Sequence, residues 1–95
     1  MPRFEWDLEK ARRNLAKHGV AFEDATLVWD DPLHLIRFDR HEQGEERWHA
    51  IGTAGGIAVL VVWHTSPDPE DAGRIRIIGA RKATRRERTA YADHP

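Results

Sequence analysis

The sequence contains no cysteine and a single serine, Ser66. Without cysteine the chain can form no disulfide, thiolate nucleophile or cysteine-ligated zinc site. Ser66 lacks a G-x-S-x-G context, which excludes a typical serine hydrolase. The longest apolar run, residues 57–63, spans seven residues, whereas a membrane-spanning helix needs ~20. Because no apolar stretch of signal-peptide length occurs near Met1, we expect a soluble, cytoplasmic protein without a membrane partner.

Charge is unevenly distributed along the chain, whose 95 residues suit one domain over 1–95. Residues 1–73 hold 8 Lys+Arg and 14 Asp+Glu, whereas residues 74–95 hold 7 Lys+Arg and 2 acidic residues. Arginine outnumbers lysine 12 to 3, and the guanidinium fork suits bidentate contact with phosphate. The basic C-terminal segment indicates a polyanion-binding face, but a solvated helix that merely balances the acidic part has the same composition.

The hydrophobic periodicity predicts an α+β fold with two N-terminal helices, an antiparallel β-meander and a basic C-terminal helix. Asp7 is suited to cap the first helix and Gly19 to end it, and Gly55-Gly56 predicts a tight hairpin. In the first helix, Leu8 and Leu15 form an apolar stripe with Ala11. The predicted elements are an edge strand at 4–6, helices at 8–18 and 22–29, strands at 33–38, 46–53, 57–63 (central and buried) and 74–79, turns or loops at 40–45 and 66–73, and a helix at 81–92 that continues toward His94.

The histidines do not form a recognisable metal motif. None of them makes an i, i+4 pair or an H-E-x-x-H element, so we expect no metal and no other cofactor. Three lie on separate predicted strands and could converge, although scattered surface or hydrogen-bonded histidines are the simpler interpretation. The six are His18, His34, His41, His49, His64 and His94.

The C-terminal segment concentrates the residues that could carry chemistry. Cleavage of RNA without a metal needs a base for the 2′-hydroxyl, cations for the phosphorane and an acid for the leaving 5′-oxygen. Glu87 lies among the cations and could be the base, or it could be only their structural ion-pair partner. On a helix, Arg81, Arg85 and Arg88 form one row, Lys82 and Arg86 form the next, and Tyr91 lies one turn beyond Glu87.

Two further candidates come from the predicted strands. Arg47 could reach the same face as the last helix, or it could pair with Glu45 or Glu46 on its own strand. His64 ends the central strand, and an imidazole suits proton transfer near neutral pH, which makes it a secondary acid–base candidate.

Three stretches in order resemble the BrnT family of toxins, and the likeness runs from about Phe4 to Tyr91. The opening stretch is Phe4-Glu5-Trp6-Asp7 with Lys10, Asn14, Lys17-His18-Gly19-Val20 and Phe22-Glu23-Asp24-Ala25; the middle one is Glu45-Glu46-Arg47-Trp48 with Ile51-Gly52; the closing one is 75–84 with Arg86-Glu87-Arg88 and Tyr91.

The resemblance implies a RelE-like ribonuclease toxin of a type II toxin–antitoxin system, which inhibits translation. It implies a cognate BrnA-like antitoxin that binds and covers the site, RNA as substrate (free or on the ribosome), and operator DNA bound only through the antitoxin in a hetero-oligomer. The residues carried over as catalytic candidates are Arg47, Arg81, Lys82 and Glu87, with His64 beside them. The expected phosphate contacts are Arg76, Arg85, Arg86, Arg88 and Tyr91, although the Tyr91 ring could equally serve in docking.

The chain departs from the family at positions that favour an alternative. Gly79 stands where the family typically has serine, and an acidic loop at 65–71 stands where many members carry an arginine. Ala21 also replaces a usual serine. These departures favour a non-catalytic module that binds nucleic acid or a protein partner. A third interpretation is that the basic C-terminal segment docks an acidic stretch of the antitoxin.

Overall fold

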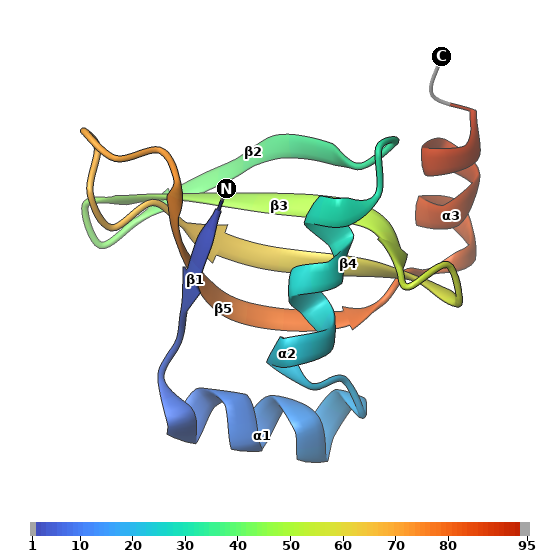
Figure 1. Cartoon of the computed structure of the whole chain (residues 1–95), viewed down its shortest axis with the longest axis horizontal. Helices are drawn as coiled ribbons and strands as arrows, with labels where there is room; N and C mark the ends of the chain where they lie inside the picture. Colours follow the sequence, from blue (N-terminus) through green and yellow to red (C-terminus); the bar gives the residue numbers. More distant parts are fainter. Residues whose placement is uncertain (1, 94–95) are drawn as a thin grey trace.

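The computed structural model describes residues 2–93 and forms a five-stranded sheet with helices on both sides (Figure 1). The strand order is β1-β5-β4-β3-β2; β1 pairs parallel with β5, and all other neighbours are antiparallel. The α+β prediction is therefore confirmed, while the RelE-like label stays a prediction. In chain order the elements are β1 (Arg3–Glu5), α1 (Leu8–His18), α2 (Phe22–Ala25), the 3-10 helix η1 (Thr26–Asp30), β2 (Leu35–Glu42), β3 (Glu45–Ala54), β4 (Ala58–Thr65), β5 (Arg74–Lys82) and α3 (Arg85–Ala92).

The local signals at the ends of the first elements are confirmed. The Asp7 carboxylate accepts a hydrogen bond from the Lys10 amide at 3.0 Å, and Gly19 ends α1 in the left-handed conformation with φ 70°. Gly55 and Gly56 both have positive φ in the β3–β4 turn, as the central positions of a type I′ turn require, and the Ile57 amide donates to the Ala54 carbonyl at 3.2 Å.

Helix α1 attaches to the sheet differently from the prediction. Leu8 and Leu15 are 74% and 51% exposed, so the expected apolar stripe does not face the core. The helix instead packs through Ala11 and Asn14. The Asn14 amide donates to the Ala80 carbonyl (2.8 Å), and its oxygen accepts from the Ala80 amide (3.1 Å). A side-chain amide thus pairs with the β5 backbone where β1 no longer does.

The core lies between the sheet and the α2–η1 segment. Phe22 and Val28 are fully buried against Val62 and Ile77 of the central strands. The predicted second helix stops as α-helix at Ala25 and continues as the 3-10 turn η1. No helix within residues 2–93 is long and apolar enough to cross a membrane.

Several strand boundaries differ from the prediction. Strand β2 runs on to Glu42, so the turn is confined to Gln43-Gly44, where both residues have positive φ. Ile57 is 91% exposed in the hairpin turn, so the central strand begins at Ala58. The centrality of β4 itself is confirmed.

The most consequential difference is at the end of β5. Arg81 and Lys82 are strand residues, paired with Val61 and Leu60, and the last helix begins only at Arg85. The Thr84 hydroxyl caps that helix by accepting from the Glu87 amide, and the Glu87 carboxylate accepts from the Thr84 amide in return. Because this capping box fixes the helix start, the row Arg81–Arg85–Arg88 does not form. The predicted continuation toward His94 lies outside the described residues.

Candidate functional site

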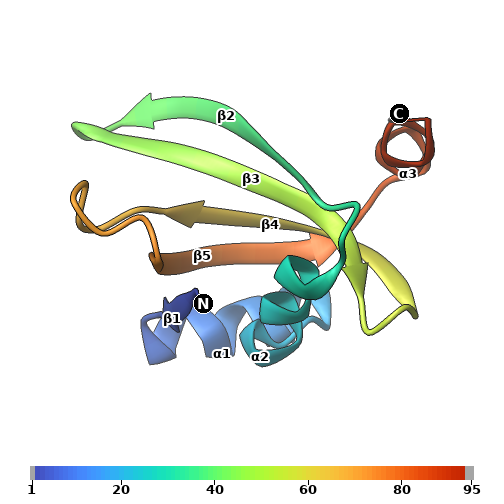
Figure 2. The ribbon, with the colours of Figure 1, turned by 45° about the horizontal axis from the view of Figure 1, so that its top comes forward.

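The two faces of the sheet differ in cover. Figure 2 shows α1 and α2 on one side, which we call the helix face, and α3 on the other side beside the end of β5. We call this second side the open face. Strand alternation and register place five side-chain positions of β3, β4 and β5 there: Arg47, His49, Trp63, Gly79 and Arg81.

Arg81 and Trp63 form the centre of the open face. The Arg81 guanidinium carbon lies 5.0 Å from the centroid of the Trp63 ring, within cation–π range. Two hydrogen bonds hold this guanidinium to the Glu87 carboxylate, at 2.7 and 3.0 Å. This pairing raises the pKa of Arg81 above its ordinary value. Arg81 is therefore held in a defined position across the aromatic ring.

The same contacts make Glu87 a weak base. Hydrogen bonds from Arg81, with a further one from the Thr84 amide, outweigh the effect of burial and lower the pKa of Glu87 to about 2. A general base works best with a pKa near the operating pH. The geometry thus gives Glu87 the role of positioning Arg81 and capping α3.

Arg47 and His49 are alternate residues of β3, so both side chains lie on the open face. Their side chains are 23% and 22% exposed. Arg47 Nη1 lies 3.3 Å from Glu42 Oε2, so its partner is neither of the neighbours that sequence suggested. His49 Nδ1 lies 3.6 Å from Asp39 Oδ1, and its ring lies 6.3 Å from that of Trp63. The distance to Asp39 is longer than a hydrogen bond, so the carboxylate lies near the imidazole without fixing its orientation. A partly exposed imidazole can take part in proton transfer.

A depression borders the open face where α1 meets the edge of β5. Its volume is about 410 Å³, and most of its lining side chains are cationic. Sequence reasoning missed the α1 members, although their i, i+3, i+7 spacing beside the apolar residues was a readable signal. The lining residues are Lys10, Arg13, Asn14, Lys17, His18, Arg47, Ile78 and Gly79.

Two of the predicted catalytic residues do not join this surface. His64 is buried on the helix face, with its ring 4.9 Å from that of Trp29. Burial lowers the pKa of His64 to about 4, so the imidazole is neutral and shielded from solvent. Lys82 follows Arg81 on a strand, so its side chain points to the opposite face, where it borders a hollow that also includes Ile57. The structure therefore separates Lys82 from Arg81.

The remaining predicted phosphate contacts are dispersed. Arg76 is held by the Glu5 carboxylate, with Nη2 at 2.8 Å, near the far end of β5. Arg88 is exposed and donates to the Ala83 carbonyl at 2.9 Å. Arg85 and Arg86 are exposed in the first turn of α3. Among the described residues, the hydrogen-bond partners of the Arg81 side chain are Lys82 and Glu87, and none of these four.

Tyr91 anchors α3 to the body of the protein. Its ring packs beside the buried Ile51 and Val61, and its hydroxyl donates to the Asp31 carboxylate. Burial by itself raises the pKa of Asp31, but this bond and those from the backbone amides of Thr53 and residue 33 lower it to about 2. These contacts support the docking role for Tyr91.

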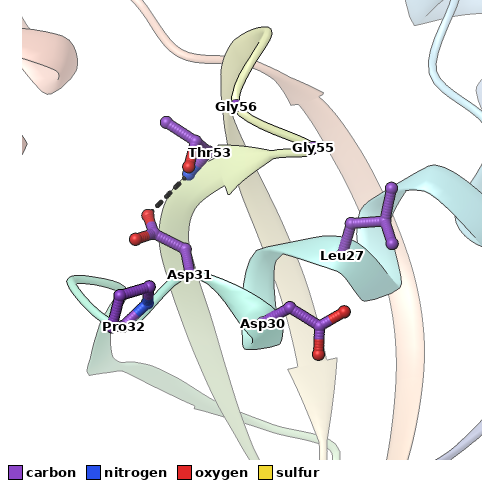
Figure 3. A pocket seen from close by; sticks show the side chains of 7 residues that line it. All are labelled: Leu27, Asp30, Asp31, Pro32, Thr53, Gly55 and Gly56. Carbon is purple, nitrogen blue, oxygen red and sulfur yellow. Dashed lines mark hydrogen bonds between the residues drawn. The ribbon is translucent and has the colours of Figure 1, made fainter.

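Another hollow, of about 260 Å³, lies beside this anchor (Figure 3). The Asp31 carboxylate points toward the Thr53 backbone, and Asp30 points away from it. Within residues 2–93, no group of three histidine, cysteine, aspartate or glutamate side chains is placed to hold a metal ion.

Comparisons with known proteins agree with the fold and identify a family. A family model described as ribonuclease toxin, BrnT, of type II toxin–antitoxin system matches residues 6–87. The crystal structure of the Brucella abortus ribonuclease toxin BrnT superposes with a TM-score of 0.62 and 23% identity, covering 90% of this chain and 100% of that one. A search of curated proteins gives no match. The structural likeness shows a shared fold, and the family match spans most of the chain. The chain thus belongs to the BrnT family of type II toxin–antitoxin ribonuclease toxins.

Proposed function

We propose that this protein is a metal-independent endoribonuclease that cleaves RNA on the open face, inhibits translation and is neutralised by a cognate antitoxin. The observation that carries the proposal is the joint placement of Arg47, His49, Trp63 and Arg81 on one solvent-facing side of the sheet. Aromatic rings are platforms for unstacked bases, and guanidinium groups are suited to phosphate.

The surface offers groups for each part of the reaction. The 2′-oxygen attacks phosphorus, forming a cyclic phosphate, while the bond from phosphorus to the 5′-oxygen breaks. His49, which lies 3.6 Å from Asp39, accepts the 2′-hydroxyl proton and then returns a proton to the leaving 5′-oxygen. Arg47 and Arg81 stabilise the charge that develops on the phosphorane oxygens. Glu87 acts through Arg81, as a positioning residue.

The acidic loop lies at the Arg47 end of the open face and away from Arg81. The hollow that it borders is lined by Ser66, Pro67 and Pro69 with residues 43–46 and Trp48, so the loop lies beside the β2–β3 turn. That end of the sheet is opposite α3 (Figure 1). Arg3 is paired with Asp71 of the loop, which offsets part of its charge.

The edge strand β2 supports the assignment of a protein partner. Strand β2 forms the edge of the sheet away from β1, and its Ile36 and Phe38 are about half exposed. Exposed apolar side chains on an edge strand are typical of protein contacts. The family is one of toxins from type II toxin–antitoxin systems, so we assign this partner as a BrnA-like antitoxin that also supplies the contact with operator DNA.

Cleavage of an end-labelled RNA by the purified protein, with and without EDTA, tests the proposal. We expect EDTA-resistant cutting that His49→Ala and Arg47→Gln each reduce at least about a hundredfold. His41→Ala is the matched control, because this exposed histidine packs beside Phe38 on β2 instead of on the open face. Absence of cutting on both free RNA and translating ribosomes, by folded protein that still binds RNA, would establish the non-catalytic module instead.

A further inference from the structure

We propose that the depression between α1 and β5 is a phosphate-binding subsite, which holds an RNA backbone phosphate next to the nucleotide on the open face. The inference rests on the proposed function, since it assigns a second contact to the same RNA strand. It adds Lys10, Arg13 and Lys17, with the neighbouring His18, to the residues that bind substrate.

The position of these side chains is fixed by the way α1 is attached. The Asn14 amide is hydrogen-bonded to both backbone groups of Ala80 and to the Val20 carbonyl, at 2.8 to 3.1 Å. This locks the rotation of the helix about its own axis. Lys10 and Lys17, seven residues apart, then project on the same side, with Arg13 between them.

The depression is electrostatically suited to an anion. Among the described residues, the side chains of Lys10, Arg13 and Lys17 form no ion pair within 4.0 Å, and no carboxylate lines the depression. The Asp7 carboxylate is close enough to interact with Lys10 and Arg13, but its hydrogen bond to the helix N-terminus is its main contact.

The chemistry of the lining favours phosphate over an acidic protein segment. Ile78 is the one large apolar side chain among the lining residues, whereas the cores of protein interfaces are rich in aromatic and aliphatic anchors. Gly79 has no side chain, and a Cβ built there has only Asn14 Oδ1 within 4 Å, at 4.0 Å. The floor is therefore open enough for a phosphate to approach the β5 backbone.

The depression is continuous with the proposed cleavage surface. Arg47 belongs to both, and Gly79 on its floor is the cross-strand partner of Trp63. Neighbouring strands lie about 4.8 Å apart, so the depression begins one strand away from the Trp63 ring. An RNA molecule with one base stacked on the Trp63 ring can therefore place an adjacent backbone phosphate in the depression beside α1.

The test is the affinity of wild type, Arg13→Gln and Arg12→Gln for a short fluorescent 2′-O-methyl RNA, which binds but cannot be cleaved. Arg12 is the matched control, since it is the adjacent arginine on α1, is exposed and pairs with Glu9 outside the depression. Each phosphate contact with a single strand contributes about −0.7 to the slope of log K, the binding constant, against the log of the salt concentration. At 0.1 M salt, one such contact raises the affinity about fivefold. We expect Arg13→Gln to weaken binding by about fivefold and reduce the slope by about 0.7, with less than twofold change for Arg12→Gln.

Equal affinities for the two variants would overturn the subsite, as would Arg13→Gln weakening the antitoxin complex while RNA affinity is unchanged. Cleavage by wild type reports separately on the proposed function. If the protein binds RNA through Arg13 but never cuts it, the subsite stands and the nuclease proposal is refuted. If the protein cuts RNA but Arg13→Gln and Arg12→Gln have equal RNA affinities, the nuclease proposal stands and the subsite is refuted.

Discussion

Replacing Glu87 with glutamine separates a positioning role from a catalytic one. The variant keeps the side-chain shape and can still accept a hydrogen bond from the Thr84 amide, because glutamine also fits the capping box. It removes the charge that holds Arg81 through two hydrogen bonds of 2.7 and 3.0 Å. The change therefore acts mainly on the ion pair and leaves the helix cap in place.

The magnitude follows from the lowered pKa of Glu87, about 2 in the folded protein against 4.5 ordinarily. The difference corresponds to about 3 kcal/mol before screening. Because the Glu87 side chain is 27% exposed, we expect about 1 to 2 kcal/mol of the free energy of unfolding to be lost. A lowered carboxyl pKa stabilises the fold above the unfolded value, so this contribution is present above pH 4.5 and disappears as the pH falls toward 2.

Urea denaturation of wild type and Glu87→Gln at pH 7 and pH 3 measures this directly. The stability gap of about 1 to 2 kcal/mol at pH 7 should narrow clearly at pH 3. Cleavage at pH 7 should fall by no more than about tenfold, and the pH profile of kcat/KM should keep its shape, whereas loss of a general base typically lowers the rate by about 10² to 10⁴. A difference in unfolding free energy that does not change with pH would refute the positioning role. A loss of cleavage rate of about 10² to 10⁴ would also refute it.

Two further comparisons test the geometry. Arg81→Gln should lower kcat/KM by about a hundredfold while Lys82→Gln changes it less than about twofold, because the two side chains lie on opposite faces of β5; equal losses in an RNA-cleavage assay would contradict this arrangement. Gly79→Ala should raise the free energy of unfolding by about 0.5 kcal/mol, whereas Gly52→Ala, whose Cβ would lie 3.0 Å from the His34 and Val28 side chains, should lower it by about 1 to 3 kcal/mol. Thermal or urea denaturation that found Gly52→Ala more stable than Gly79→Ala would contradict the packing described around these two glycines.

The features that sequence predicted well depend on contacts within a few residues. Asp7 caps a helix because the amides it satisfies are in the next turn, and Gly19 ends that helix because it can adopt a positive φ. Gly55-Gly56 likewise specifies its hairpin locally. These positions delimit α1 and the β3–β4 hairpin without any knowledge of the sheet.

The candidate site was harder to predict because it depends on register between distant strands. The sequence 81–92 has helical spacing throughout, but pairing of Arg81 with Val61 extends β5 and delays the helix to Arg85. The pattern Thr84-x-x-Glu87 is the local signal that could have located the helix start. The sequence favoured His64, at the end of the central strand, as the acid–base candidate. Only the sheet geometry places His64 in the core and His49 on the open face.

The termini of the RNA fragments produced by the purified protein test the central claim most directly. The account predicts cutting in EDTA that leaves a 2′,3′-cyclic phosphate on one fragment and a 5′-hydroxyl on the other, because the attacking group is the neighbouring 2′-oxygen. Fragments that end in a 3′-hydroxyl and a 5′-phosphate, or cutting that stops when divalent metal is removed, would contradict it.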